Sequence, residues 1–588
     1  MDYQFKDGAI VAKGKFFERT IYDVSNEVLS ATFNGKGGVE EYLIANGEQY
    51  KGNKFASISY NGVMQDALLN KTVFMFGRRQ TIWIELKDAV LSIEHFLDEK
   101  VNGVFTSYRL ITGRKEDKAE VSLTSMIKYN DNKSGVVKVF LGEEKGFAAS
   151  GSCEYIMENR AMIVRLSYEE PVVNTFMTFG ELPEAIENYI EKFDDYRNAL
   201  ELEKRAIRVP KGLNEEETAL FYNTYYCSLE NYKEYGEYKG FMAGCRYLSP
   251  MRSYYRDSYF TVLPMYNGHI DKVRSQIFTL AKGIAEDGTC PSAVKWDWSA
   301  HWGNHYDSPS FLAMMLYDYI KFTGDVSYAD VPVGDSSVLE QAVKAIKNLT
   351  KCTDGTGLLN KKGKYNRRDW ADEVNRYGYV TYDEILYARA LYSLAKIYEL
   401  RGEKVLYEEY NNRFEIVKKA INDILWDEEL GYYVNFKNED YAETNLSVDT
   451  VFAAIFGIAD EERSKTLLLK MEQLLESQNN GTPEAFGCMC VYPFYSRIDA
   501  SYHKSSQSYD YHNGSNWPYL TAMYAYAKRK FGMEYKYLLT DWFTYNLKKG
   551  NYTPIEYFSP YCEDGSLLQA WGGDAAFVLD EEISRDFW

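Results

Sequence analysis

The sequence predicts a multidomain β + α protein, in which a β-rich N-terminal part precedes a ring of helical hairpins. Three observations support this fold class. The chain has 588 residues, more than a single hydrophobic core usually serves, so at least two domains are expected. The spacing of apolar residues changes from a period of two to about 3.6 near residues 183–207. About twelve helical segments follow, and their connections alternate between short and long.

The N-terminal part reads as a β-sandwich. Short alternating runs rich in β-branched and aromatic residues, such as TIWIELKDAVLSIEHFL at 81–97 and AMIVRLSYEEP at 161–171, are separated by the turn sequences NGKGG and YNG. A helical linker is expected after it, because PEAIENYIEKFDDYRNALELEKRAI has helical periodicity. We therefore place the β-domain at 1–182, the linker at 183–210 and the helical domain at 211–588.

The helical domain is predicted to consist of six hairpins. The expected helices span 214–232, 257–266, 268–285, 307–322, 337–351, 382–402, 404–424, 446–457, 461–477, 512–531, 534–548 and 571–580. The long connections run from odd to even helices, at 233–256, 286–306, 352–381, 425–445, 478–511 and 549–570. Long loops are usually functional, and in an antiparallel ring of hairpins these six emerge at one end. We therefore expect the functional site at that end.

Charge and composition exclude several classes of partner. The formal net charge is −19, from 86 acidic against 67 basic residues, so no source of attraction to phosphate backbones is evident and nucleic acid is not expected. The first residues lack a signal-peptide pattern and no window is apolar enough to span a membrane, which predicts a cytoplasmic protein without a membrane partner. The eight scattered cysteines are interpreted as reduced thiols. His301 and His305 lack an evident third ligand, so neither a metal nor another cofactor is expected.

The long loops hold nearly every unusual polar and aromatic cluster of the chain. Five of them contain SYYRDSYF (253–260), CPSAVKWDWSAHWGNHYDSP (290–309), RRDWADEVNRYGYVTYDE (367–384), SYDYHNGSNWPYL (508–520) and NYTPIEYFSPYCEDGSLLQAWGG (551–573). Aromatic rings stack on sugar faces, and carboxylates accept hydrogen bonds from hydroxyls. Because these loops have few basic residues, they predict a pocket for a neutral polyhydroxylated ligand, such as a small oligosaccharide.

Two carboxyl groups from different loops could hydrolyse a glycosidic bond. One must be protonated to donate to the leaving oxygen, and the other must be ionised to activate water or to attack the sugar. We select Asp372 and Glu556. Asp369, Glu373 and Glu384 surround the first of these, and we expect such like charges to raise its pKa.

The helical region, roughly 205–588, resembles the six-hairpin glycosidases, especially the glucosidase half of glycogen debranching enzymes and the processing α-glucosidases. The motifs that carry the resemblance are DWADE (369–373), YDEILYARAL (382–391), IEYFSPYCEDG (555–565) and AWGGDAAF (570–577). The resemblance implies an N-terminal β-sandwich followed by an (α/α)6 toroid barrel, and an inverting mechanism. It also implies that Asp372 is the general acid, Glu556 the general base and Glu384 a sugar-binding acid.

Further segments, RDSYF, DSPSFLAMMLYDYIKFTGD (307–325) and YHNGSNWP (511–518), are similar to the remaining barrel signatures. Together the motifs and the loop clusters give a set of expected substrate-binding residues: Tyr255, Arg256, Asp257, Trp298, Trp302, His305, Asp307, Trp370, Glu384, His512, Asn513, Trp517 and Trp571.

The expected function is that of an exo-acting inverting glycosidase, cleaving α-glucosidic bonds in small oligosaccharides. Two alternatives stay open. DWADEVNRYG is also similar to the DWNDG loop of disaccharide phosphorylases, which use phosphate in place of a base, although the presence of Glu556 favours water as the nucleophile. A carbohydrate-binding protein without catalysis is the other alternative, and it would have no need for both carboxylates.

Overall fold

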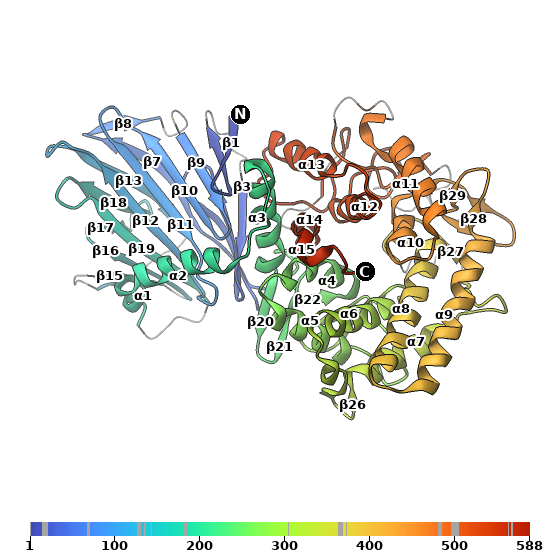
Figure 1. The fold of residues 1–588 in the computed structure, drawn as a ribbon. Helices are drawn as coiled ribbons and strands as arrows, with labels where there is room; N and C mark the ends of the chain where they lie inside the picture. Colours follow the sequence, from blue (N-terminus) through green and yellow to red (C-terminus); the bar gives the residue numbers. More distant parts are fainter. Residues whose placement is uncertain are drawn as a thin grey trace.

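A β-rich domain precedes a helical domain in the computed structural model of the chain (Figure 1). The structure describes residues 2–13, 21–66, 71–125, 131–133, 137–142, 144–180, 185–303, 305–362, 369–371, 373–479, 482, 485–495, 505–562, 564–565 and 569–588. No helix in these ranges has both the length and the apolar character needed to cross a membrane.

The N-terminal domain is built from antiparallel sheets. The largest has ten strands in the order β1-β2-β9-β10-β11-β12-β19-β16-β15-β14, and sheets of five strands (β17-β18-β13-β7-β8) and four strands (β3-β4-β5-β6) accompany it. The strands are β1 Asp2–Lys6, β2 Ala9–Lys13, β3 Ile21–Ser25, β4 Leu29–Asn34, β5 Val39–Ile44, β6 Gln49–Lys51, β7 Asn53–Tyr60, β8 Val63–Gln65, β9 Lys71–Phe76, β10 Arg79–Glu85, β11 Val90–Phe96, β12 Val104–Ile111, β13 Lys118–Ser125, β14 Asp131–Lys133, β15 Val137–Gly142, β16 Lys145–Ser150, β17 Cys153–Ile156, β18 Ala161–Ser167 and β19 Val172–Phe179. The strict alternation of burial along β10 explains why this part of the sequence has a period of two.

Two helices cover part of the outer face of the ten-stranded sheet. These are α1 (Glu187–Glu191) and α2 (Phe193–Ala206), in the segment where the sequence predicts a helical linker. Phe193 packs on Phe96 and Phe105, which point outward from β11 and β12. The helices therefore shield one part of that face and leave the part nearer β9 and β10 open.

The helical domain is a ring of paired helices. The first members of the pairs are α3 Glu215–Glu230, α5 Ile270–Lys282, α7 Val338–Thr350, α9 Lys404–Ile424, α11 Glu461–Leu475 and α13 Lys536–Lys548, and the second members are α4 Tyr255–Thr261, α6 Ser308–Thr323, α8 Thr381–Leu400, α10 Phe452–Ile455, α12 Pro518–Lys530 and α14 Asp574–Leu579. Each second member from α4 to α12 contacts the next, and α14 contacts the turn η1 (Leu263–Tyr266) that follows α4. α6 is buried nearly all round, whereas α7 buries one face, as expected for inner and outer helices.

Some predicted boundaries need correction. The helix expected over 512–531 begins at Pro518, because the preceding residues bridge to another loop and proline favours the first helical turn. The segment expected as a helix over 446–457 is a short strand, the 3₁₀ turn η3 (Val448–Val451) and α10. A short additional helix, α15 (Glu581–Ser584), follows α14.

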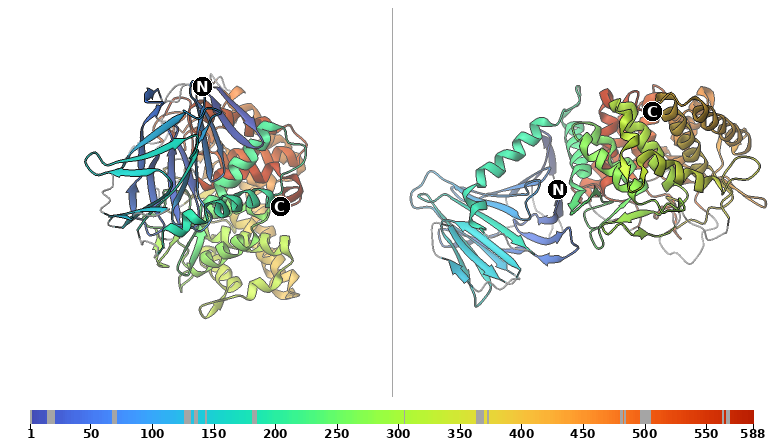
Figure 2. Two further views of the ribbon diagram at one scale, coloured as in Figure 1. Left: turned by 90° about the vertical axis from the view of Figure 1, so that its left-hand side faces the viewer. Right: turned by 90° about the horizontal axis from the view of Figure 1, so that it is seen from below.

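The two domains contact each other directly, as the views of Figure 2 show. α3 packs against β1 and β2, and the Glu230 carboxylate accepts a hydrogen bond from the Ser25 backbone N–H at 3.0 Å. Lys272 of α5 pairs with Glu27 at 2.5 Å, and both side chains are buried. One continuous set of buried apolar side chains runs through both domains.

Candidate active site

The six long loops are joined to one another at one end of the helical ring. The joins are made by the strand pairs β22 (Arg252–Tyr254) with β23 (Ala293–Lys295), β27 (Tyr379–Val380) with β30 (Phe436–Lys437) and β32 (Leu446–Ser447) with β33 (Val491–Tyr492), and by the bridges Asn516–Phe558 and Gly244–Gln569. Tyr306 of the second loop lies over Lys361 of the third, with 5.4 Å between the ring centre and Nζ. The loops therefore form a continuous rim, as the alternation of short and long connections predicts.

A buried ion network fixes the third loop. Asp369 accepts hydrogen bonds from Arg376 at 2.7 Å and from Lys361 at 2.5 Å, and all three side chains are almost fully buried. Arg376 also donates at 2.8 Å to Asp449, which lies in the turn η3 just after the fourth loop. The Trp370 indole N–H donates to the same Asp449 carboxylate. The backbone directly before residue 372 is therefore held by charges from the third loop and from η3.

This network keeps Asp369 ionised. Burial raises the pKa of Asp369, but the neighbouring Arg376 and Lys361 lower it more, so the net pKa lies below its usual value. The two cations offset the charge of Asp369, and its expected effect on the pKa of Asp372 stays a prediction, because Asp372 lies outside the described residues. Asp383 behaves differently: burial raises its pKa to about 8.

Four expected binding residues from the first and second loops meet in a second ionic cluster. Asp307 accepts hydrogen bonds from Arg256 at 2.9 Å and lies 2.9 Å from His305 Nδ1, while Asp257 lies 3.9 Å from Arg256. Burial would raise the pKa of Asp307, but Arg256 and His305 hold it below its ordinary value. Asp307 is therefore an ionised carboxylate that orients Arg256.

An aromatic cluster joins the third, fifth and sixth loops. His512 stacks on Trp517 with 4.9 Å between ring centres, and Trp370 meets both rings edge-on, at 5.1 Å and 5.6 Å. Trp517 also stacks with Tyr557 at 5.6 Å and meets Trp571 at 5.7 Å. The expected aromatic residues of three loops thus form one wall.

Glu556 lies next to this wall. It is partly buried beside Tyr557, and a Cβ at Gly565 would lie 2.9 Å from its Oε2. Tyr247 of the first loop is close enough to feel its charge. The pKa of Tyr247 is raised, first because the side chain is buried and second because of the negative charge of Glu556. Asp372 lies outside the described residues, between Ala371 and Glu373. Two ring contacts, from Trp370 to Trp517 and from Trp517 to Tyr557, connect the loops that carry the two carboxyl groups.

Buried polar atoms beside these clusters lack partners among the described residues. They include the hydroxyls of Tyr382 and Tyr519 and the indole N–H of Trp571. Both tyrosines are fully buried and lie close enough to Arg256 to feel its charge. Buried polar atoms are nearly always hydrogen-bonded, so these groups are candidates to bind water or a polar ligand.

Four expected residues do not join this cluster. Tyr255 is fully buried and its hydroxyl donates to the Leu280 carbonyl at 2.7 Å, because it points to the other side of α4 from Arg256. Trp298 packs on Tyr238 and under Lys282. Trp302 is 59% exposed and stacks on His301. The Asn513 side chain accepts a hydrogen bond from the Tyr495 backbone N–H, which is a structural role.

Glu384 is also buried within the fold. Its Oε2 accepts a hydrogen bond from the Leu359 backbone N–H at 2.9 Å, and burial raises its pKa well above the usual value. It therefore holds the third loop against α8. Sequence reasoning missed Lys361, Arg376, Asp449 and Tyr519, which complete the clusters, and no pattern in the sequence singled them out. No group of three or more potential metal ligands occurs in the described part of the chain.

Comparison with known proteins supports a glycosidase. Residues 324–577 match the model of the mannosylglycerate hydrolase MGH1-like glycoside hydrolase domain, and this segment contains Asp372 and Glu556. An uncharacterized protein of Borreliella burgdorferi is 30% identical over 120 residues, which is 20% of this chain and only 24% of that protein.

Three solved structures show the fold. A bacterial glucoamylase complexed with acarbose is 13% identical and covers 97% of this chain and 95% of its own, with a TM-score of 0.63. A rhamnosidase from Klebsiella oxytoca with rhamnose bound is 14% identical, covering 85% and 88%, with a TM-score of 0.50. A GH78 family rhamnosidase of a Bacillus species is 15% identical, covering 80% of this chain and 47% of that one, with a TM-score of 0.50. The expected architecture, an N-terminal β-sandwich followed by an (α/α)6 toroid barrel, is confirmed.

Proposed function

We propose that this chain is an exo-acting, inverting glycoside hydrolase that cleaves α-glucosidic bonds in small oligosaccharides, with Asp372 as general acid and Glu556 as general base. The observation that carries the proposal is the convergence of their two loops on one aromatic wall at the loop end of the helical ring. The match of residues 324–577 to a glycoside hydrolase domain supports the same reaction class.

The clusters around the rim have distinct parts in this reaction. The Arg256–Asp307 pair, beside the unpartnered hydroxyls of Tyr382 and Tyr519, hydrogen-bonds the hydroxyls of the terminal sugar, and the wall that contains Trp517 and Trp571 borders its apolar face. The ion network of Asp369 holds the backbone that carries residue 372, so that its carboxyl group meets the glycosidic oxygen.

The proton balance then follows. The protonated Asp372 gives its proton to the leaving oxygen while the bond to the anomeric carbon breaks. Glu556 removes a proton from a water molecule that attacks the same carbon from the opposite face, which inverts the configuration. This mechanism requires the two carboxyl groups to lie about 6.5–9.5 Å apart, with the sugar and the water between them.

Two conservative substitutions test the assignment. Asp372→Asn and Glu556→Gln should each lower kcat on maltose by at least about 100-fold, because each removes one proton transfer. Asp440→Asn, at an exposed position of the same domain, is the control and should retain the wild-type rate. Proton NMR of the first product should show the inverted anomer. Full activity in either active-site variant, or a retained anomer, would contradict the proposal.

Phosphorolysis is distinguished by its nucleophile. With Glu556 as the base, the rate should not depend on inorganic phosphate and free glucose should be the product. A rate that requires phosphate, with glucose 1-phosphate as product, would identify a phosphorylase. Binding of maltose without turnover under either condition would identify a carbohydrate-binding protein.

Mannosylglycerate is a second candidate substrate, because the matched domain model is named for its hydrolysis. The two candidates differ in the leaving group, a second sugar or glycerate, while the proposed acid and base stay the same. Measuring kcat/KM for maltose and for mannosylglycerate side by side decides between them. A preference of about tenfold or more for either one corresponds to at least about 1.4 kcal/mol of differential transition-state stabilisation.

A further inference from the structure

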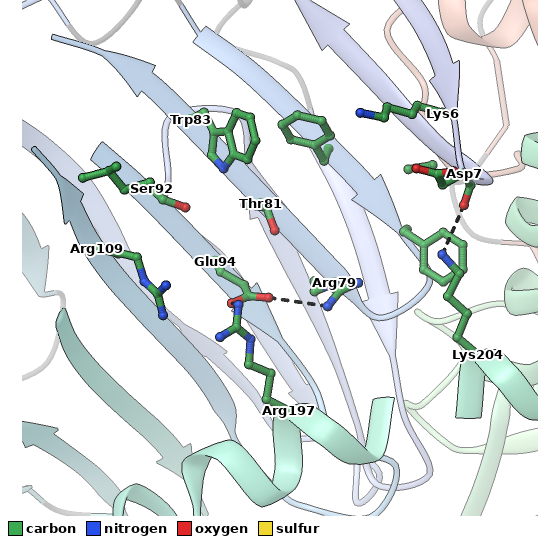
Figure 3. Close-up of a pocket in the computed structure, with 14 residues that line it drawn as sticks. Lys6, Asp7, Arg79, Thr81, Trp83, Ser92, Glu94, Arg109, Arg197 and Lys204 are labelled. Atoms are coloured by element: carbon green, nitrogen blue, oxygen red, sulfur yellow. Dashed lines mark hydrogen bonds and ion pairs between the residues drawn. The ribbon is translucent and has the colours of Figure 1, made fainter. Parts of the chain in front are cut away.

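The outer face of the ten-stranded sheet contains a hollow far from the proposed active site in the fold. It has a volume of about 440 Å³ and lies between the strands β1 and β2, the strands β9 to β12 and the helix α2 (Figure 3). α1 and the start of α2 cover the apolar part of this face, around Phe96 and Phe105. The remaining part, around β9 and β10, is open.

An aromatic platform occupies one side of this hollow. Trp83 of β10 is 46% exposed, although an outward position on a sheet is usually polar. Phe74 of β9 meets it edge-on at 4.7 Å, which fixes the orientation of the indole ring. Thr81 and Ser92 place hydroxyl groups beside the platform (Figure 3). A flat ring next to hydroxyls is the arrangement that packs on one face of a sugar.

The charge of the hollow is opposite to that of the whole chain. Its lining contains the five cations Lys6, Arg79, Arg109, Arg197 and Lys204, but only the two acids Asp7 and Glu94, in a chain of net charge −19. The buried carboxylate of Glu94 forms an ion pair with Arg197 at 2.8 Å and lies 3.6 Å from Arg79.

Three of these cations have no ion-pair partner in the described part of the chain: Arg109, Lys6 and Lys204, which donates to the Asp7 backbone carbonyl at 3.1 Å. Ser92, which pairs with Arg109 across β11 and β12, also pairs with Trp83 across β10 and β11. The Arg109 guanidinium therefore lies two strands away from the aromatic platform, with Ser92 of β11 between them, on the same face of the sheet (Figure 3). Arginine presents N–H groups in a planar fork that matches a carboxylate.

We propose that this hollow is a secondary binding site for a saccharide that carries a carboxylate group, whose ring stacks on Trp83 and whose carboxylate pairs with Arg109. A small inorganic anion would use the arginine but not the exposed platform. A neutral sugar would leave the excess of cations unmatched. The site lies on the β-domain and does not depend on the proposed catalytic residues.

Titration calorimetry with trigalacturonate tests the proposal, with its neutral methyl ester as the matched probe. Trigalacturonate should bind the full chain, and raising NaCl from about 0.05 M to about 0.5 M should weaken the binding because the attraction is screened. The Trp83→Ala and Arg109→Gln variants should each bind at least about tenfold more weakly. Tyr168→Ala, which removes another exposed aromatic residue of this domain, should bind like the wild type.

The esterified probe should bind the wild type at least about tenfold more weakly than trigalacturonate. Glu556→Gln should bind trigalacturonate like the wild type, so a failure of the proposed catalysis does not affect this test. The proposal is overturned if trigalacturonate does not bind at about 10 mM, if Trp83→Ala leaves the affinity unchanged, or if the ester binds equally well. It is also overturned if sedimentation shows a dimer that Trp83→Ala dissociates, since a second copy would then cover the platform.

Discussion

At the scale of single residues, Asp369 shows how a buried carboxylate can fix a catalytic loop. It is fully buried between Arg376 and Lys361. Asp369→Asn leaves these two cations without their shared counter-charge, so we expect a loss of about 3–5 kcal/mol in the free energy of unfolding. Urea denaturation measures this loss. The variant should also lose activity, because the backbone next to residue 372 is no longer held.

The exposed pair of Asp330 and Arg401 provides the control for this substitution. Its two hydrogen bonds are 2.9 Å long, but Asp330 is largely exposed. Exposed ion pairs contribute little, so Asp330→Asn should change stability by less than about 1 kcal/mol. Equal effects of the two substitutions would show that burial does not decide the contribution of Asp369.

Glu384 gives a prediction that depends on pH. Burial raises its pKa in the folded chain well above the value in the unfolded chain, despite the hydrogen bond from Leu359 N–H. The folded state therefore binds more protons than the unfolded state above about pH 4.3, and this residue destabilises the fold increasingly as the pH rises. Glu384→Gln removes the titration and keeps an acceptor for Leu359.

Compared with the wild type, Glu384→Gln should gain stability as the pH rises from about 5 to about 8, by at most about 1.4 kcal/mol per pH unit. Denaturation at several pH values measures the difference. If Glu384 were instead ionised and stabilised by the dipole of α8, the glutamine variant would lose stability at high pH.

At the scale of elements, the sequence predicts the helices well because each outer helix must bury one stripe against an inner one. The helix predicted over 404–424 coincides with α9, and the one predicted over 337–351 is α7 within one residue at each end. The loops were less predictable. The short strands β22, β23, β27 and β30 pair with partners from other loops, and nothing local in their sequences indicates these partners.

In the candidate site, too, some residues could be predicted from the sequence and others could not. Arg256, Asp307, Trp370, His512 and Trp517 come together in the structure because each lies in a motif at the end of a loop. The counter-charges could not be predicted, because the pairs of Arg376 with Asp449 and of Lys361 with Asp369 are set by the packing of the loops. The sequence also does not show whether a residue beside a motif residue faces the site. Tyr255 directly precedes Arg256 in the helix, yet its side chain enters the core.

The start of α7 gives a prediction about a single element. Ser337 Oγ accepts a hydrogen bond from Glu340 N–H, and the Glu340 side chain accepts one from Ser337 N–H, so this N-terminus has a complete capping box. Ser337→Ala should lower the free energy of unfolding by about 1 kcal/mol, measured by denaturation. Ser337→Asp keeps an acceptor at the cap and should stay within about 0.5 kcal/mol of the wild type. An equal loss in both variants would exclude the cap as the cause.

At the scale of the whole molecule, the β-domain and the helical ring share one hydrophobic core rather than two. Phe76 of β9 meets Tyr222 and Tyr226 of α3 edge-on, at 4.8 Å and 5.5 Å. The buried ion pair of Lys272 with Glu27 also joins the domains, and Lys272 Nζ lies 4.3 Å from the centre of the Tyr232 ring. Because apolar and ionic contacts between the domains are both buried, we expect the domains to unfold together.

Two glycines with almost the same backbone conformation test this docking. Gly8 and Gly62 both follow a residue of positive φ in a tight turn between strands, and their own φ values are 81° and 79°. A Cβ at Gly62 meets nothing within 4 Å, whereas a Cβ at Gly8 would lie 2.4 Å from the Tyr222 ring of α3.

Gly62→Ala therefore adds only the backbone strain of an L-residue, about 1–2 kcal/mol. Gly8→Ala adds the same strain and also forces the domains apart, so it should destabilise the chain by about 1–3 kcal/mol more. Calorimetry should show one unfolding transition for Gly62→Ala and a lower or divided transition for Gly8→Ala. Equal transitions in the two variants would mean that the contact between Gly8 and Tyr222 does not hold the domains together.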